Sequence, residues 1–225
     1  MTMRQQSGVT LISLMIGLTI SMILTVAMLT VFKSVILSTG GARAGASTDE
    51  QRTAALLRAN LSLQDAGYGI DAPASPHDVL VLSNATLDKT TNRLAGSVAA
   101  NGTAGNAVVW SLRPDLVTLQ CAGLIYDSAT DGTGGLKYLP AQACTAGAAG
   151  SWQTLVWAPA VWAVIRKDSP PEFPALSSVT WTLQQTSCKP FGITATEGSL
   201  TLTLNTDNGN GAVLSDTLCL INFHS

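Results

Sequence analysis

The sequence predicts an α+β protein, in which a long amino-terminal helix packs on an antiparallel β-sheet head. We expect the first half of this helix to span a membrane and its second half to be amphipathic. Residues Val9–Phe32 form an apolar run of 24 residues without a charge, which is typical of a helix that can cross a bilayer. From Val79 onward, short segments alternate apolar and polar residues with a period of two, which is typical of strands with one buried face.

Composition excludes several classes of protein. Twelve Lys and Arg stand against 14 Asp and Glu, a net charge of −2, which offers no electrostatic footprint for nucleic acid. We therefore expect no nucleic-acid partner. The two histidines and four cysteines include no Cys-x-x-Cys pair and no zinc-site spacing. We expect no metal, no cofactor and no catalytic residues, and hence a protein that is not an enzyme.

The apolar run is long enough to span a membrane. At about 1.5 Å per residue, a helix over this run is about 36 Å long, and the hydrocarbon layer is roughly 30 Å thick. Hydroxyl side chains in the run can donate to a carbonyl oxygen one turn back, which satisfies them in lipid. These residues are Thr10, Ser13, Thr19, Ser21, Thr25 and Thr30.

Three interpretations of this run are open on the residues alone. A cleaved signal peptide has an apolar stretch of only about 7 to 15 residues, so this run is too long, although Ala42-Arg43-Ala44 supplies a cleavage-like triplet. A plain membrane anchor is the simplest alternative. The third interpretation depends on the preceding polar leader, MTMRQQSG, which ends in Gly8 directly before the run.

The residues around Gly8 resemble a known processing signal. Gly8 and the apolar residues Val9–Ile16 are similar to the class III prepilin signal, and LRANLSLQDAGYG at Leu57–Gly69 is similar to a segment of PilW-type minor pilins of type IV pili. The resemblance is specific over roughly the first 70 residues. It implies a type IV pilin-like fold, cleavage between Gly8 and Val9 by a prepilin peptidase, and amino-methylation of Val9.

Two residues depart from the pattern of this family. The mature chain would begin with Val9, where the family usually has Phe or Met, and Ser13 takes the fifth mature position, where most pilins carry Glu. A carboxylate in hydrocarbon needs a partner, and the resemblance implies the terminal amine of a neighbouring subunit, which Ser13 cannot pair with. Ser13 thus implies entry into the filament by another route, for example at the tip. Alternatively, Ser13 bonds its own helix and side-chain packing holds the subunit.

The resemblance also implies how the chain is divided and located. The parts are a leader at residues 1–8, a transmembrane or filament-core helix at 9–37, its amphipathic continuation at 38–66 and a periplasmic head at 67–225. The implied partners are the prepilin peptidase, the inner membrane, the major pilin and other minor pilins, and the implied final location is a pilus at the cell surface. The flanking charges do not favour this orientation, because Arg4 precedes the run while Lys33 and Arg43 follow it.

The amphipathic continuation follows a segment rich in glycine. Three glycines in Ser38–Ser47 each weaken a helix by about 1 kcal/mol relative to Ala, which predicts a bend or a loosened turn. Helical periodicity resumes over Thr48–Ala66, where Ala54, Leu57 and Leu61 share one face. On the residues alone it is an amphipathic surface helix of the head, whereas the resemblance implies the lower half of one long helix; in either case we expect it to cover the sheet.

The remaining chain contains short strand-like segments. These are Val79–Leu82, Ala107–Leu112, Leu116–Tyr126, Thr154–Ile165, Val179–Leu183, Leu200–Leu204 and Ala212–Phe223. The turn residues Asn205–Gly211 predict a hairpin between the last two.

The cysteines indicate an oxidising compartment, which favours a periplasmic head. Cys121, Cys144, Cys188 and Cys219 fit two disulfides, with three possible pairings. Sequential pairing, which we favour, closes loops of 22 and 30 intervening residues, each worth about 3 to 4 kcal/mol. Four free buried thiols in a reducing compartment are the alternative.

Other candidate sites are weak. Asp127, Asp131 and Gly132 match part of a calcium loop, but Ala129 and Tyr138 stand at ligand positions, which favours an ordinary turn. The two histidines, His77 and His224, are expected to be exposed. The five tryptophans are expected in the core, unless one between Trp152 and Trp162 is exposed for contact with a subunit or a sugar.

Three functions remain as hypotheses. The first is a structural minor pilin that takes part in pilus assembly at or near the filament tip, with indirect roles in motility or adhesion. The second is a minor pseudopilin of a type II secretion system. The third, from a different class, is a secreted sugar-binding module.

Overall fold

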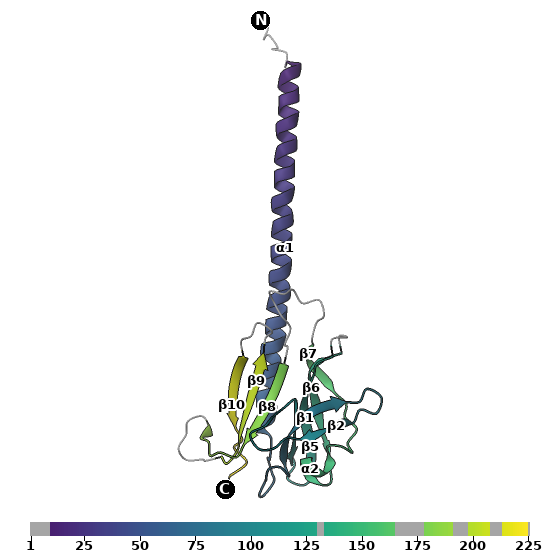
Figure 1. Cartoon of the computed structure of the whole chain (residues 1–225), viewed down its shortest axis with the longest axis vertical. Coiled ribbons are helices and arrows are strands. Elements are labelled where there is room, and N and C mark those ends of the chain that lie inside the picture. The colour runs from purple at the N-terminus through teal and green to yellow at the C-terminus, as the bar shows by residue number, and fades with distance from the viewer. Residues whose placement is uncertain (1–9, 130–132, 165–177, 191–197, 208–212, 225) are drawn as a thin grey trace. The chain divides into compact units, whose positions relative to one another are not determined.

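A computed structural model describes residues 10–129, 133–164, 178–190, 198–207 and 213–224, apart from the side chains of residues 41–45, 47 and 48. The chain forms two compact units, Met1–Ala46 and Ser47–Ser225. Helix α1 (Leu11–Gln64) begins in the first unit and ends in the second, which also contains all the strands. This architecture confirms the predicted α+β class (Figure 1).

The glycine-rich segment of α1 is helical. The helix continues without interruption through Ser38–Ser47, so the predicted loosened turn was wrong. Three alanines, at positions 42, 44 and 46, alternate with the other residues here. Because Ala has the highest helix propensity of all residues, these alanines offset part of the helix stability that the glycines cost.

The buried face of α1 in the head unit also differs from the prediction. Ala55, Ala59 and Leu63 are buried, whereas Leu57 and Leu61 are 60% and 55% exposed, and Ala54 is exposed as well. Both sets repeat every three or four residues, so the spacing alone fits either face. The structure selects the face with the smaller side chains, because alanines let a helix approach its neighbours closely.

Two antiparallel sheets make up the rest of the head unit (Figure 1). The six-stranded sheet has the order β2 (Leu94–Val98), β1 (Val79–Leu87), β4 (Ala107–Leu112), β5 (Gln120–Asp127), β6 (Gly135–Ala143), β7 (Ala160–Val164). The four-stranded sheet has the order β10 (Val213–Cys219), β9 (Thr201–Asp207), β8 (Ser178–Gln184), β3 (Ala104–Gly105). A short helix, α2 (Gly147–Ser151), follows β6.

The chain crosses from one sheet to the other at Asn106, between β3 and β4. The Asn106 Nδ2 donates to the carbonyl oxygens of Ala85 (2.8 Å) and Tyr126 (3.1 Å), and its Oδ1 accepts from the Ala85 N–H (2.7 Å). A Cβ at the preceding Gly105 would lie 2.2 Å from the Leu82 carbonyl oxygen. The crossing therefore needs both the Asn106 amide and a glycine.

The six-stranded sheet is covered on both faces at its centre. One face joins a core with Ala59 and Leu63 of α1 and with Trp181 of the four-stranded sheet. The other face joins a second cluster with Ala148 of α2 and with Trp157. Strand β4 is consequently buried at every position, which explains why its sequence, AVVWSL, does not alternate.

Most of the predicted strands are present, with altered ends. Strands β1, β4 and β8 confirm their predictions, and β9 and β10 form the predicted hairpin with seven consecutive pairs. Strand β10 ends at Cys219, where a turn follows with a hydrogen bond from the Phe223 N–H to the Leu220 carbonyl. The predicted turn began too early, because Asn205–Asp207 belong to β9 and pair with β10; residues 208–212 lie outside the described residues.

Two strands begin later than predicted, for identifiable reasons. The side chain of Asp115 holds a turn ahead of β5, because its Oδ1 accepts from the N–H groups of Val117 (3.0 Å) and Thr118 (2.7 Å), so β5 begins at Gln120 and not at Leu116. Strand β7 begins at Ala160 and not at Thr154, directly after Pro159, which cannot donate to a ladder. Ile165, its predicted end, lies outside the described residues.

Candidate functional site

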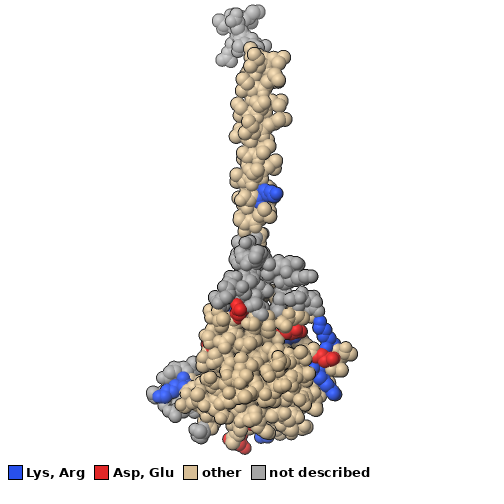
Figure 2. Space-filling model, viewed as in Figure 1, with Lys and Arg blue, Asp and Glu red and all other residues tan. Residues whose placement is uncertain are grey.

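The first unit offers a candidate membrane span. By length and composition, Leu11–Gly40 of α1 can cross a membrane, with a mean hydropathy of 2.3 and 0% of its most apolar window buried inside the protein. Lys33 is the sole charged residue in this range, and Figure 2 shows the rest of this stretch free of charged side chains. This stretch therefore presents a surface of apolar and hydroxyl side chains with a single charge.

Four of the six hydroxyl residues named in the sequence analysis bond to the helix itself, as predicted. The hydroxyls of Thr19, Ser21, Thr25 and Thr30 each donate to the carbonyl oxygen three residues earlier, at 2.9, 2.9, 2.8 and 2.7 Å. A helix carbonyl has a second lone pair, so it accepts this bond without giving up its backbone partner. These hydroxyls are satisfied without water.

The residues predicted for processing sit at the start of this unit. Gly8 and Val9 lie outside the described residues, so cleavage between them stays a prediction. Ser13 is exposed in the first turn of α1. The first acidic residue of the helix is Asp49, so the span contains no carboxylate that could pair with an amine.

Both predicted disulfides are present in the head, and they pair the four cysteines in sequential order. Cys121 of β5 pairs with Cys144, and Cys188 pairs with Cys219 at the end of β10. Each bond joins Cα atoms 5.7 Å apart. Cys121 is fully buried in the cluster beneath α2, so this bond belongs to the core, whereas Cys188 and Cys219 are only partly buried.

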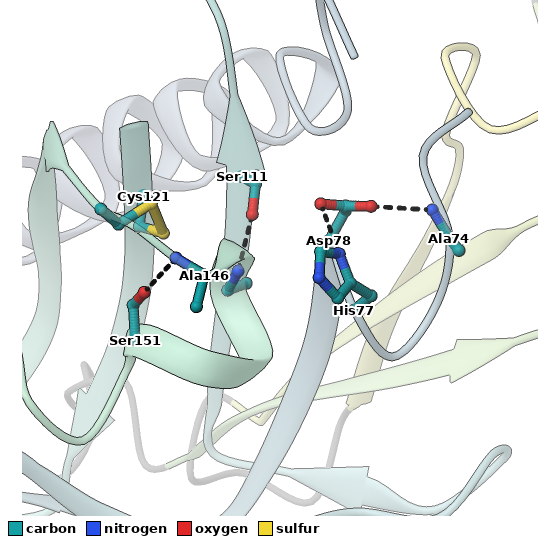
Figure 3. A network of polar contacts seen from close by, with 9 residues as sticks. Ala74, His77, Asp78, Ser111, Cys121, Ala146 and Ser151 are labelled. Atoms are coloured by element: carbon teal, nitrogen blue, oxygen red, sulfur yellow. Dashed lines mark hydrogen bonds and ion pairs between the residues drawn. A yellow bond between two sulfur atoms is a disulfide. The ribbon is translucent and has the colours of Figure 1, made fainter. Parts of the chain in front are cut away.

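Polar groups near α2 hold secondary structure together (Figure 3). The Ser111 Oγ accepts from the Ala148 N–H at 2.7 Å, and the Asp78 carboxylate accepts from the Ala74 N–H at 3.0 Å. The exposed His77 places its Nδ1 3.0 Å from Asp78. Ser111 is fully buried and its hydroxyl accepts a hydrogen bond from α2. Ser111, His77 and Asp78 therefore do not form a nucleophilic site.

The partial calcium-loop match has another explanation. Asp127 lies 2.6 Å from the Nζ of Lys137 on the neighbouring strand β6. Burial raises the pKa of Asp127, but the hydrogen bond and charge of Lys137 and a backbone hydrogen bond from Ala129 outweigh it and lower the pKa. Asp131 and Gly132 lie outside the described residues, and the described part of the chain contains no cluster of three or more His, Cys, Asp or Glu that could hold a metal.

The tryptophans mainly fill the core, as predicted. Trp110, Trp152, Trp157 and Trp181 are buried. Trp162 of β7 is partly buried and stacks on Tyr138, with ring centroids 4.6 Å apart and planes at 14°. His77 and His224 are exposed, as expected. A sugar platform of several exposed rings is therefore not formed by the tryptophans of the head.

Comparison with known proteins adds one finding about the amino-terminal unit. The family described as the prokaryotic N-terminal methylation motif matches residues 3–29, a range that includes Gly8, Val9 and Ser13. Neither the curated proteins nor the solved structures include a match to this chain. Proteins with this prepilin-type signal are generally structural, and the signal implies processing by a prepilin peptidase, membrane anchoring and assembly with other pilins. The chain thus combines the signal and the architecture of the type IV pilin and pseudopilin class.

Proposed function

We propose that this chain is a PilW-like minor pilin that takes part in type IV pilus assembly at or near the filament tip. The observation that carries the proposal is the methylation motif at residues 3–29 on a helix whose span has no carboxylate. The motif supports the class. The missing carboxylate supports a position at the filament tip, where this subunit does not have to pair a carboxylate with the terminal amine of a neighbouring subunit.

The proposed pathway begins in the inner membrane. The prepilin peptidase removes residues 1–8, Val9 is methylated, and residues 9–37 stay in the membrane while residues 38–66 lead into a head at 67–225. The two disulfides support a head in the oxidising periplasm. The helix then enters the filament, where packing against other subunits' helices replaces lipid contacts.

Mass spectrometry of the mature amino terminus tests the processing step. We expect a chain that begins with N-methylated Val9, and a Gly8→Glu variant that keeps all eight leader residues, because the prepilin signal places the cut directly after a glycine. The control variant Ser7→Ala should be processed normally. A mature chain that begins at Gly45 or Ser47 would show a cleaved signal peptide and contradict the proposal.

Deletion of the gene separates the pilus from the type II secretion system. Loss of surface pili and twitching, with secreted enzymes unchanged, is the expected result. Failure to secrete exoproteins with normal pili would favour the pseudopilin. Immunogold labelling of the head then tests the location, for which we expect label at one filament end, and label spaced along the shaft would contradict a tip position.

A further inference from the structure

Strand β10 is an open edge of the four-stranded sheet. It pairs with β9 on one side, and no strand among the described residues pairs with its other side. Seven consecutive pairs, from Val213 opposite Asp207 to Cys219 opposite Thr201, run without a register shift. An edge of this length and regularity presents a row of unpaired N–H and C=O groups to another strand.

The other sheet edges are protected in ways that β10 is not. Strand β3 has only two residues. Strands β2 and β7 have five residues each, and a register shift interrupts the pairing of each with its neighbour. Short strands and bulges are common protections against edge pairing. Strand β10 has no bulge, no Pro and no Lys, and its single charged residue is Asp216.

The inner face of β10 carries Leu214, Asp216 and Leu218, of which the first two are exposed. Residues opposite each other in an antiparallel pair point to the same face, so Leu214 shares the inner face with Thr206, which is 2% exposed. Leu214 itself is 57% exposed. The edge of the sheet therefore leaves Leu214 uncovered, and one further strand beside β10 would cover it.

Helix α1 has exposed leucines on the same side. The Asn60 Nδ2 donates to the Asp216 Oδ2 of β10 at 2.5 Å, which places this turn of the helix against the inner face of β10. At about 100° per residue, Leu57 and Leu61 lie roughly 60° and 100° around the axis from Asn60, on the side away from the buried Ala59. Both are more than half exposed.

We propose that β10 accepts an edge strand from the head of another pilin-class subunit, and that the inward side chains of this strand cover Leu57, Leu61 and Leu214. This inference rests on the proposed function, because assembly with other subunits supplies the partner. The added strand would bond the free edge of β10 and continue its sheet. Its inward residues would be apolar except at the position opposite Asp216, and its outward residues would be polar, continuing the row of Ser215 and Thr217.

The charge of Asp216 indicates a different subunit as the partner, not a second copy of this chain. A symmetric antiparallel pairing of all seven β10 residues would centre on Asp216 and set the two carboxylates opposite each other. Like charges directly opposite in a sheet are destabilising. A partner with Lys, Arg or an amide at this position would instead complement Asp216.

Site-specific photo-crosslinking in the producing bacterium tests this surface in the full chain. A benzophenone side chain replaces Val213, Leu57 or, as a reference in the span, Ile23. We expect adducts from positions 213 and 57 with the same partner, which carries its own prepilin-type signal. Leu214→Lys should lower the yield of both about tenfold, because it places a charge where the partner's apolar side chains lie. The matched control Val117→Lys, at an exposed apolar residue ahead of β5, should leave both unchanged.

The outcomes separate this inference from the proposed function. Adducts from Ile23 that persist while positions 213 and 57 give none would overturn the inference alone. Adducts to a second copy of this chain, adducts to a protein without the signal, or an undiminished yield in Leu214→Lys would also overturn it. Loss of every adduct, including those from Ile23, would show that the chain does not assemble with pilins and would refute both.

Discussion

Two leucines on α1, two residues apart, provide a sharp test of how the helix packs. Leu63 is 1% exposed and belongs to the core, whereas Leu61 is 55% exposed. Replacing Leu63 with Ala removes buried methyl groups and leaves a cavity in the core cluster that includes Trp181 and residues of both sheets. Replacing Leu61 with Ala removes side-chain area that already contacts solvent, and Ala is as good a helix former as Leu.

The expected magnitudes differ several-fold. A buried Leu→Ala change lowers the free energy of unfolding by about 2 to 5 kcal/mol, whereas an exposed change stays within about 0.5 kcal/mol. For a unit of this size, 1 kcal/mol corresponds to about 2 to 4 °C in Tm. We therefore expect Leu63→Ala to lower the Tm by roughly 10 °C and Leu61→Ala to change it by less than about 2 °C.

Thermal unfolding followed by near-ultraviolet circular dichroism measures this difference in the full chain in detergent. All five tryptophans lie between positions 110 and 181, so the signal reports the head and not the membrane span. Equal shifts in the two variants, or a larger shift for Leu61→Ala, would refute the described helix face. That result would favour the face formed by Ala54, Leu57 and Leu61.

Two other perturbations probe the head. Replacing Cys121 and Cys144 with Ala should destabilise the head more than replacing Cys188 and Cys219. The chain-entropy loss is about 3 to 4 kcal/mol for either pair, but only the first pair also leaves a cavity in the core; equal midpoints in urea would contradict this. Because the pKa of Asp127 is lowered, its contribution to stability is present above the ordinary carboxyl pKa and is lost as the pH falls through the lowered value. Lys137→Met should flatten the decline of stability below about pH 4, as measured by urea unfolding at each pH, and an unchanged decline would contradict the pairing.

Several elements could be predicted from local sequence because local chemistry determines them. The span follows from an uncharged run, and the β9–β10 hairpin follows from two alternating segments separated by turn residues. The hydroxyl bonds of Thr19 and Thr25 are also local, because each partner is one helical turn away. Predicting the disulfides required only the number of cysteines and a preference for sequential pairing.

Other features depend on contacts between distant segments. The buried face of α1 was mispredicted because hydrophobicity favours Leu57 and Leu61, while close packing against two sheets favours Ala55 and Ala59. Strand β6 was missed. Its third residue is the buried Lys137, which is explained by a partner, Asp127, on the neighbouring strand. The open edge at β10 could not be predicted from the sequence, because whether a strand lies at an edge depends on how all the other strands pair.

The hydroxyls along the span have a consequence for how the rod changes surroundings. Thr19, Ser21, Thr25 and Thr30 carry their own acceptors with them, so under the proposed function these four hydroxyls exchange no polar partner when the helix moves from the bilayer into a bundle of neighbouring helices. For these four residues the two environments then differ in shape and dispersion contacts. For these hydroxyls, the fit of the helix against its surroundings, and not the pairing of polar groups, then decides between lipid and neighbouring helices.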